Sequence, residues 1–294
     1  MTTNLDALLA ALYVFIDDHV VPRRRIGRPP KLTDAELLCL AVAQVLLGFP
    51  STRHWIRFAH ARLGHLFRYL PQQSAYNKRL NAAGPLISAA IQALARQVPT
   101  WHDNLRLIDS TPLPCASSRE TVKRSDLAGH AGYGYCRSHS RFFWGFRLYL
   151  LTTAEGMPVS WCLANPKLGE RQVMTALLER DHHLLRSGQV ILADKGFAGR
   201  KFEAFLEERL GVHLVRPDLK SEPVRHGRLA SVRQWIEAVF DTLKGQLSLE
   251  QHGGRTLAGV FARTGQRLLA LATAIWHNWT TNAPTKRSLI AYDH

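Results

Sequence analysis

The chain has 294 residues, of which 46% are hydrophobic and 21% charged, which is enough apolar material for one large domain or two modest ones. Lysine and arginine number 38 against 23 aspartates and glutamates, and this formal charge of +15 favours a polyanionic partner such as nucleic acid. The longest apolar run, residues 37–49, is too short to span a bilayer, and the four scattered cysteines argue against zinc and a disulfide framework. Residues 1–16 also lack the features of a secretory signal, so we expect a cytoplasmic protein.

Residues 1–98 are predicted to be helical. Leucines and a phenylalanine recur at spacings of three and four between residues 5 and 15, which indicates one amphipathic helix. After a basic linker at 22–31, Thr33 and Glu36 form a capping box that opens an apolar helix to Leu47. Ser51 can cap a second helix, and a third begins near Ser74. Three short helices joined by tight turns fit a helix-turn-helix unit.

This helical segment contains two groups of basic residues that are candidates for DNA binding. The first lies in the linker, where a Gly-Arg-Pro core could enter a narrow minor groove or could serve only as a solvated connection; its members are Arg23, Arg24, Arg25 and Arg28. The second lies on the third helix and consists of Lys78 and Arg79. That helix could read DNA or serve in dimerisation, and the sequence leaves both open.

From residue 105 the pattern changes to alternating strands and helices. We predict strands at 105–108 and 190–193, a hairpin of 146–151 with 159–163, and a further strand at 212–215. Helices are predicted at 170–185, 200–209, 231–247 and 257–279. This order indicates an α/β sheet covered on both faces. We therefore divide the chain into a helical domain at 1–98, a catalytic domain at 99–282 and a tail at 283–294 that is expected to fray.

Two aspartates follow buried apolar strands, Asp109 after Leu-Ile and Asp194 after Leu-Ala. The carboxyl ends of strands in open α/β sheets are where ligands bind, although aspartate at such a place can also start a turn or cap a helix. A third carboxylate, Glu237, lies on the predicted helix 231–247. If that helix is regular, Arg233, Glu237 and Lys244 form a row along the border of its buried side, unless they belong to an ordinary solvated face.

These residues suit the chemistry of phosphoryl transfer. Magnesium takes oxygen ligands and keeps several waters, so two or three carboxylates from separate elements suffice to hold it. Two such ions can activate an attacking oxygen and stabilise the leaving oxygen of an in-line displacement. Arg233 and Lys244 would then meet the phosphates of a nucleic acid.

Together the motifs resemble those of bacterial insertion-sequence transposases with an RNase H-like DDE domain, particularly a compact branch of about this length. Asp109 in Leu-Ile-Asp-Ser-Thr-Pro looks like the first catalytic aspartate, and Asp194 in Leu-Ala-Asp-Lys-Gly-Phe looks like the second. Arg233-x3-Glu237-x6-Lys244 is similar to the signature around the family's catalytic glutamate, although Ala230 stands where a tyrosine is usual. The matched region runs from about residue 105 to 279.

The resemblance implies a mixed five-stranded RNase H-like sheet flanked by helices, behind an all-α helix-turn-helix-like domain. It implies Mg²⁺ or Mn²⁺ as cofactor, two ions held by Asp109, Asp194 and Glu237, and a DNA contact at Lys195. The reaction would be cleavage at the element's terminal repeats and attack of the freed 3′-hydroxyl on target DNA. Because joining two ends needs two active sites, we expect a homodimer or larger assembly on DNA, within a bacterial nucleoid.

Residues 119–147 interleave basic and aromatic side chains, a composition that suits distorted or single-stranded DNA ends. The basic members are Lys123, Arg124, Arg137, Arg141 and Arg147. We expect Phe143 and Trp144 to be core residues of a strand, and Tyr133 and Tyr135 to be at the surface.

Two other classes of function compete with an active transposase. One is a DNA-binding protein whose catalytic domain is inactive or repurposed, and the other is an RNase H-like nuclease that cuts without joining. Intact acids at all three motif positions argue against decay.

Overall fold

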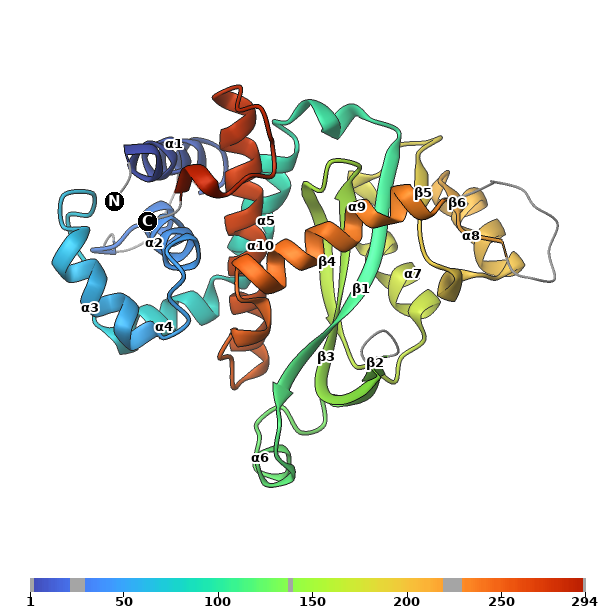
Figure 1. The fold of residues 1–294 in the computed structure, drawn as a ribbon, viewed down its shortest axis with the longest axis horizontal. Helices are drawn as coiled ribbons and strands as arrows, with labels where there is room; N and C mark the ends of the chain where they lie inside the picture. Colours follow the sequence, from blue (N-terminus) through green and yellow to red (C-terminus); the bar gives the residue numbers. More distant parts are fainter. Residues whose placement is uncertain (1–2, 22–29, 137–139, 219–228, 293–294) are drawn as a thin grey trace. The chain divides into compact units, whose positions relative to one another are not determined.

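The computed structural model describes residues 3–21, 30–136, 140–218 and 229–292 (Figure 1). Contacts between Cα atoms divide the chain into two compact units. The helical unit comprises Met1–Val98 and Leu243–His294, and the sheet unit comprises Pro99–Thr242. In the described part of the chain, no helix combines the length and the apolar character needed to cross a membrane.

The described part of residues 1–98 is helical, as predicted, although the helix at 84–95 was not predicted as a separate element. The helices of the helical unit are α1 (Thr3–His19), α2 (Asp34–Leu46), α3 (Thr52–Arg62), α4 (Gln73–Ala82), α5 (Gly84–Ala95) and α10 (Leu257–Thr280). The predicted capping box is present at the start of α2: Thr33 Oγ1 accepts a hydrogen bond from Glu36 N at 3.1 Å, and Thr33 N donates to Glu36 Oε2 at 2.6 Å. Ser51 caps α3 through the backbone amide of His54, as predicted.

Helix α10 lies at the centre of this unit. It packs against α1, α2, α4 and α5, and nearly every residue from 259 to 278 is buried, the behaviour of a helix that is covered all round. The helix itself was predicted, but its contacts group it with the N-terminal helices. The compact units therefore divide the chain differently from the predicted segment 99–282, because α10 closes the helical core rather than the sheet.

Residues 283–292 fold back onto the end of α10, and the expectation that this tail frays is wrong. The side chain of Asn278 donates hydrogen bonds to the carbonyls of Lys286 and Ser288, at 2.9 and 2.7 Å. The buried Tyr292 hydroxyl contacts His277 Nδ1 and Asn278 Oδ1, both at 2.8 Å. These polar contacts near the last turn of α10 hold residues 283–292 in place. The composition of these residues alone does not predict an ordered segment.

The sheet unit contains a mixed sheet. Its strands are β1 (Leu105–Ala116), β2 (Gly132–Cys136), β3 (Arg141–Thr153), β4 (Pro158–Ala164), β5 (Val190–Leu192) and β6 (His213–Val215). Strand β3 pairs antiparallel with β1, β2 and β4, whereas β1, β5 and β6 are parallel (Figure 1). The predicted hairpin is the pair β3–β4, which turns at residues 154–157.

Six strands make a sheet that is five strands wide. Strand β1 takes one edge of β3 along residues 144–153, so β2, which pairs with residues 141–145, lies on the other edge. Strand β4 follows β2 along that same edge, opposite residues 147–152. The mixed sheet flanked by helices that we predicted is confirmed, with β2 as an addition to one of its five positions.

Four helices belong to the sheet unit: α6 (Arg119–Lys123), α7 (Glu170–Arg180), α8 (Arg200–Leu210) and α9 (Ala230–Asp241). Helix α7 contacts β4 and α8, and α9 contacts β1, which it crosses in Figure 1. Among the described side chains of α9, Ile236, Val239 and Phe240 are buried, whereas Trp235 is exposed. The predicted helix 231–247 is not continuous, however. It ends at Asp241, and residues 242–246 form a π-helical turn.

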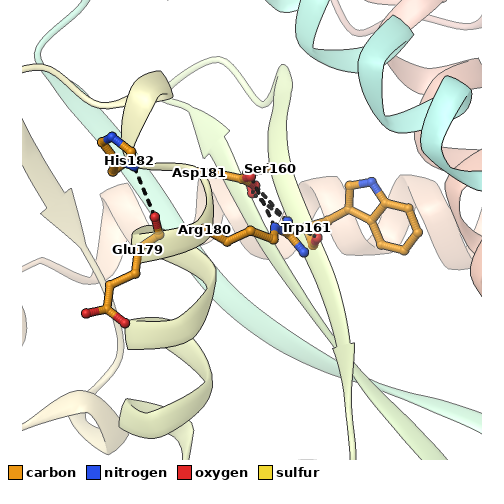
Figure 2. A network of polar contacts seen from close by, with 6 residues as sticks. All are labelled: Ser160, Trp161, Glu179, Arg180, Asp181 and His182. Atoms are coloured by element: carbon orange, nitrogen blue, oxygen red, sulfur yellow. Dashed lines mark hydrogen bonds and ion pairs between the residues drawn. The ribbon is translucent and has the colours of Figure 1, made fainter.

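The carboxyl end of α7 is fixed to strand β4 by a polar network (Figure 2). Arg180 Nη2 donates to Asp181 Oδ2 at 2.6 Å and to the carbonyl of Trp161 at 3.0 Å, and the hydroxyl of Ser160 also donates to Asp181. Burial alone would raise the pKa of Asp181, but the hydrogen bonds from Arg180 and Ser160 outweigh it and hold the pKa below the ordinary 3.8. The ionised form of Asp181 is thus the stabilising one.

Asp181→Asn should lower the free energy of unfolding by about 1–3 kcal/mol at pH 7, the range for losing charge-assisted hydrogen bonds at a buried group. Since the folded-state pKa is depressed, the stabilisation is complete above the unfolded value of 3.8 and disappears as pH falls through the folded value. Urea unfolding between pH 7 and 3 should show the difference between the two proteins shrinking below pH 4. A difference that stays constant with pH would contradict this account, and the exposed Asp126→Asn is the matched control.

Candidate active site at the ends of strands β1 and β5

The first two predicted acids lie at the same level of two neighbouring strands. Strands β1 and β5 run parallel, and their last paired residues are Leu107 and Leu192. Asp109 and Asp194 each lie two residues beyond that pair, so the register of the sheet puts both residues at the same level near the carboxyl end of β5. Both residues are half-buried. The structure therefore places Asp109 and Asp194 at the same level of two neighbouring strands, at the edge where the sequence predicted ligand binding.

Strand β1 does not end at Asp109, contrary to the sequence prediction. It continues to Ala116, paired with β3 throughout, while β5 leaves its other edge after Leu107. This continuation of β1 contains Pro112 and Pro114. Because Pro112 and Pro114 are two residues apart, the N–H groups that they lack would both face the same edge of β1. A strand tolerates proline where that edge is unpaired. Asp109 thus lies inside a rigid strand at the point where one edge opens.

Each aspartate has one oxygen oriented by the backbone that follows it. Asp109 Oδ1 accepts from Ser110 N at 2.7 Å, and Asp194 Oδ1 accepts from Lys195 N at 2.6 Å. Asp194 also caps the short 3₁₀ helix Lys195–Phe197. Local hydrogen bonds of this kind fix the side-chain rotamer of an acid and hold its charge in place.

A polar bridge connects β1 beside Asp109 to the loop that follows β5. Arg147 Nη1 on β3 donates to Ser110 Oγ at 2.8 Å and to Glu170 Oε1 at 2.9 Å, where Glu170 is the first residue of α7. The other oxygen of Glu170 lies against Gly196, so closely that a Cβ at position 196 would collide with it. The bridge thus runs from the neighbour of Asp109 to the loop that follows Asp194.

Sequence analysis missed this role of Arg147 and Glu170. Arg147 was noted only as a basic residue among aromatic ones, and Glu170 only as the start of a helix. Their pairing joins positions 23 residues apart, which no periodicity reveals. The one available signal was Gly196, whose place directly after Asp194-Lys195 is a place where a side chain would not fit.

The third predicted acid is not gathered with the first two. Glu237 is exposed on α9, the helix that contacts β1. Within the described ranges, no three His, Cys, Asp or Glu side chains lie together so that they could hold a metal ion. The two acids that the register of the sheet places at one level are Asp109 and Asp194. Two carboxylates fit a hard cation such as Mg²⁺, which commonly takes one or two of them and completes its shell with water and phosphate oxygens.

The predicted DNA contacts near this site have mixed outcomes. Lys195 is exposed beside Asp194. Lys244 lies in the π-helical turn, so the row that we projected from Arg233 through Glu237 is broken there, because a π turn changes the angle per residue. The backbone of Arg233 belongs to α9. The linker arginines Arg23, Arg24, Arg25 and Arg28 lie outside the described residues.

The remaining predicted contacts lie elsewhere in the two units. Lys78 is exposed on α4, whereas the guanidinium of Arg79 donates to Asp34 at 2.5 Å and to the carbonyl of Leu32, so it ties α4 to the start of α2. Lys123 forms an exposed ion pair with Glu120 at 3.2 Å. Arg124 is exposed at the end of α6.

The aromatic residues of β2 and β3 divide as expected. Phe143 and Trp144 are buried, and Tyr133 and Tyr135 are exposed. Phe142 is 78% exposed, and its ring centroid lies 4.9 Å from that of Tyr135. The β2–β3 hairpin therefore carries an aromatic patch of Tyr133, Tyr135 and Phe142 on its surface. Arg137 lies outside the described residues.

Gly196→Ala should lower the free energy of unfolding by about 1–3 kcal/mol, because the new methyl group meets the Glu170 carboxylate. In a Glu170→Ala background the same change should cost much less, since the opposing group is gone. Urea unfolding of the four proteins measures this coupling. Gly64→Ala, which adds a methyl group in open space, is the control. Equal costs of Gly196→Ala in both backgrounds would show that Glu170 and Gly196 are not in contact.

Comparisons with known proteins identify the family of the chain. A family model described as a transposase DDE domain matches residues 100–273. The cryo-EM structure of a piggyBac transposase synaptic complex with hairpin DNA is similar at 10% identity with a TM-score of 0.44, over 97% of this chain and 76% of that one. A comparison with curated proteins gave no match. The family match covers more than half of the chain and includes Asp109, Asp194 and Glu237, so the chain belongs to the DDE transposase family.

Proposed function

We propose that the chain binds the terminal inverted repeats of its insertion sequence, cleaves the DNA there, and joins the 3′-hydroxyl ends to target DNA by metal-dependent phosphoryl transfer. The observation that carries this proposal is the level pair Asp109 and Asp194 at the open edge of β1, in a chain of the DDE transposase family. DDE transposase domains generally depend on divalent metal ions.

The proposed cofactor is Mg²⁺ or Mn²⁺, as two ions, with Asp109 and Asp194 as ligands and Glu237 as the third acid. Bound there, the ions would activate the attacking oxygen and stabilise the leaving oxygen of an in-line displacement. The contribution of the chain is to keep the two aspartates level and oriented. The Ser110–Arg147–Glu170 bridge supports this role because it ties the residue after Asp109 to the loop after Asp194.

The proposed partner is double-stranded DNA, both element ends and target. A net charge of +15 supports a polyanionic partner, and the exposed Lys195 lies one residue from a proposed metal ligand, where it would meet a phosphate. We propose that residues 1–98 bind DNA or dimerise, and that the protein acts as a homodimer or larger assembly, because two ends must reach two active sites.

Asp109→Asn and Asp194→Asn should each reduce cleavage at the element ends by more than about 100-fold, since the loss of a metal ligand should exceed the loss of a group that only supports one. Glu237→Gln should do the same if it is the third acid. The assay uses purified protein, labelled DNA carrying the ends that flank the gene, and Mg²⁺ or EDTA. Asp126→Asn, an exposed acid outside the site, should cleave normally.

The products of this assay separate the competing functions. Metal-dependent cuts together with joined products support the transposase. Cuts without joining would indicate a nuclease, and tight binding without cuts would indicate an inactive or repurposed DNA-binding protein. Full activity of Asp194→Asn would contradict the assignment of that residue.

The aromatic patch on the β2–β3 hairpin should favour DNA with unpaired ends, because exposed rings stack on bases that have left the helix. Phe142→Ala should weaken binding to a frayed duplex by about 1–3 kcal/mol and leave binding to a closed hairpin duplex nearly unchanged. Fluorescence anisotropy with the two DNAs measures this. Equal losses on both would contradict stacking.

A further inference from the structure

The helical unit contains a polar pocket of about 490 Å³, and its lining includes none of the acids of the proposed active site. Its walls come from the start of α3, from α4, and from the segment that leads into α10. The lining residues are Pro50, Ser51, Thr52, Arg53, Gln73, Asn77, Asn81, Gly253, Gly254, Arg255, Thr256, Gly259 and Arg263. Three of them are arginines and none is an aspartate or glutamate, so the lining carries an uncompensated positive charge.

Among the lining residues, Arg263 on α10 most strongly favours a bound anion. Its side chain is only 7% exposed, and Nη2 donates to Thr52 Oγ1 at 3.0 Å and to Asn77 Oδ1 at 2.7 Å. Both acceptors are neutral, and in the part of the chain that the structure describes no ion pair joins Arg263 to a carboxylate. Buried charges in proteins are normally paired, because an isolated one loses its hydration without compensation.

A second buried arginine increases this charge. Arg267 follows one turn later on α10, is 3% exposed, and donates only to neutral acceptors, which are the Gln266 side chain and the backbone carbonyls of Ser248, Gln251 and Arg263. Burial, followed by the charge of Arg263, lowers the pKa of Arg267 to about 10, so both groups stay positive at neutral pH. Two like charges at i and i+4 inside a helical core are destabilising unless an anion offsets them.

The backbone around the pocket suits an anion as well. Helices α3 and α10 both begin at its wall, with Ser51 and Thr256 as their N-caps, and helix N-termini favour negative charge. Gly254 lies so close to the first turn of α10 that a Cβ would stand 2.6 Å from Val260 N. The glycine therefore keeps the loop against the helix start. The carboxamide of Asn81, whose Oδ1 has no hydrogen-bond partner, can turn its NH₂ group towards a bound anion.

We propose that this pocket binds a phosphodiester of the DNA backbone, as a second DNA contact apart from the residues of the active site. Arg53 and Arg255 are exposed at the pocket while Arg263 is buried behind them, which matches a phosphate group that enters from a polymer rather than a small ion that is enclosed. The inference rests on the proposed function in one respect, namely that DNA is the substrate. The role of the pocket would be to hold the DNA in register, without reading the DNA sequence.

The test is the salt dependence of DNA binding by the full chain. The double variant Arg53→Gln/Arg255→Gln changes two exposed side chains and should fold normally. It should bind a labelled duplex more weakly, and the slope of log Kobs against log salt should become shallower by about 0.9, the value for one lost phosphate contact. Arg62→Gln/Arg68→Gln removes two exposed arginines of the same unit outside the pocket and is the matched control.

A second variant tests the buried charge without removing it. Asn77→Asp supplies the missing carboxylate at a position 2.7 Å from Arg263 Nη2. It should raise the melting temperature of the free protein, because the guanidinium gains an ion pair, and it should weaken DNA binding, because the anion is no longer needed. A merely structural role of Arg263 would give the first effect without the second.

The outcomes separate this inference from the proposed function. If the wild-type chain binds no DNA, both fail. If it binds DNA and the pocket variants behave like the control, only the pocket inference is overturned. Inorganic phosphate provides the remaining arm: if it raises the melting temperature of the wild type but not of Arg53→Gln/Arg255→Gln, while DNA binding by that variant matches the control, then the pocket holds a free anion and the DNA proposal is wrong.

Discussion

The parallel pairing of β1 with β5, which stops after Leu107 and Leu192, is the constraint on which the site depends. Parallel strands with a fixed register deliver their following residues to the same level, so the backbone hydrogen bonds of β1 and β5 determine the level of Asp109 and Asp194. Strand β1 then continues along β3 to Ala116, which keeps the first aspartate on a rigid element while one of its edges stays open. Rigid support of this kind is what positioned catalytic carboxylates require.

Helix α7 makes the second half of the site equally rigid. Asp181 at its carboxyl end is fixed to β4 through Arg180 and Ser160, and Glu170 at its amino end reaches Arg147 and Gly196. The loop after Asp194 is therefore held by a helix that is itself fixed at both ends. Modest ion pairs at half-exposed positions contribute little stability individually, but here they determine where a loop lies.

The elements that the sequence could predict were those with local causes. The capping box of Thr33 and Glu36 and the apolar strand before Asp194 each depend only on residues that are close in the sequence. Both predictions were confirmed. The continuation of β1 through Pro112 and Pro114 was not predicted, because a strand tolerates proline only where the edge facing the missing N–H group is unpaired, and the sequence does not show which edge that is. The position of Lys244 was predicted from a regular helix, but a π turn interrupts that helix. The pocket around Arg263 could not be predicted at all, since its partners Thr52 and Asn77 lie 211 and 186 residues away.

The central claim, that Asp109 and Asp194 hold a divalent cation that cleaves DNA, is tested most directly by exchanging the ligand atom. Asp109→Cys and Asp194→Cys replace a hard carboxylate oxygen by a soft thiolate, which Mg²⁺ binds poorly and softer ions such as Mn²⁺ or Zn²⁺ accept more readily. We predict that each variant fails to cleave the element ends in Mg²⁺ and regains cleavage when a softer ion is supplied, whereas Asp126→Cys cleaves in Mg²⁺ as the wild type does. Cleavage in Mg²⁺ by both ligand variants would contradict the claim.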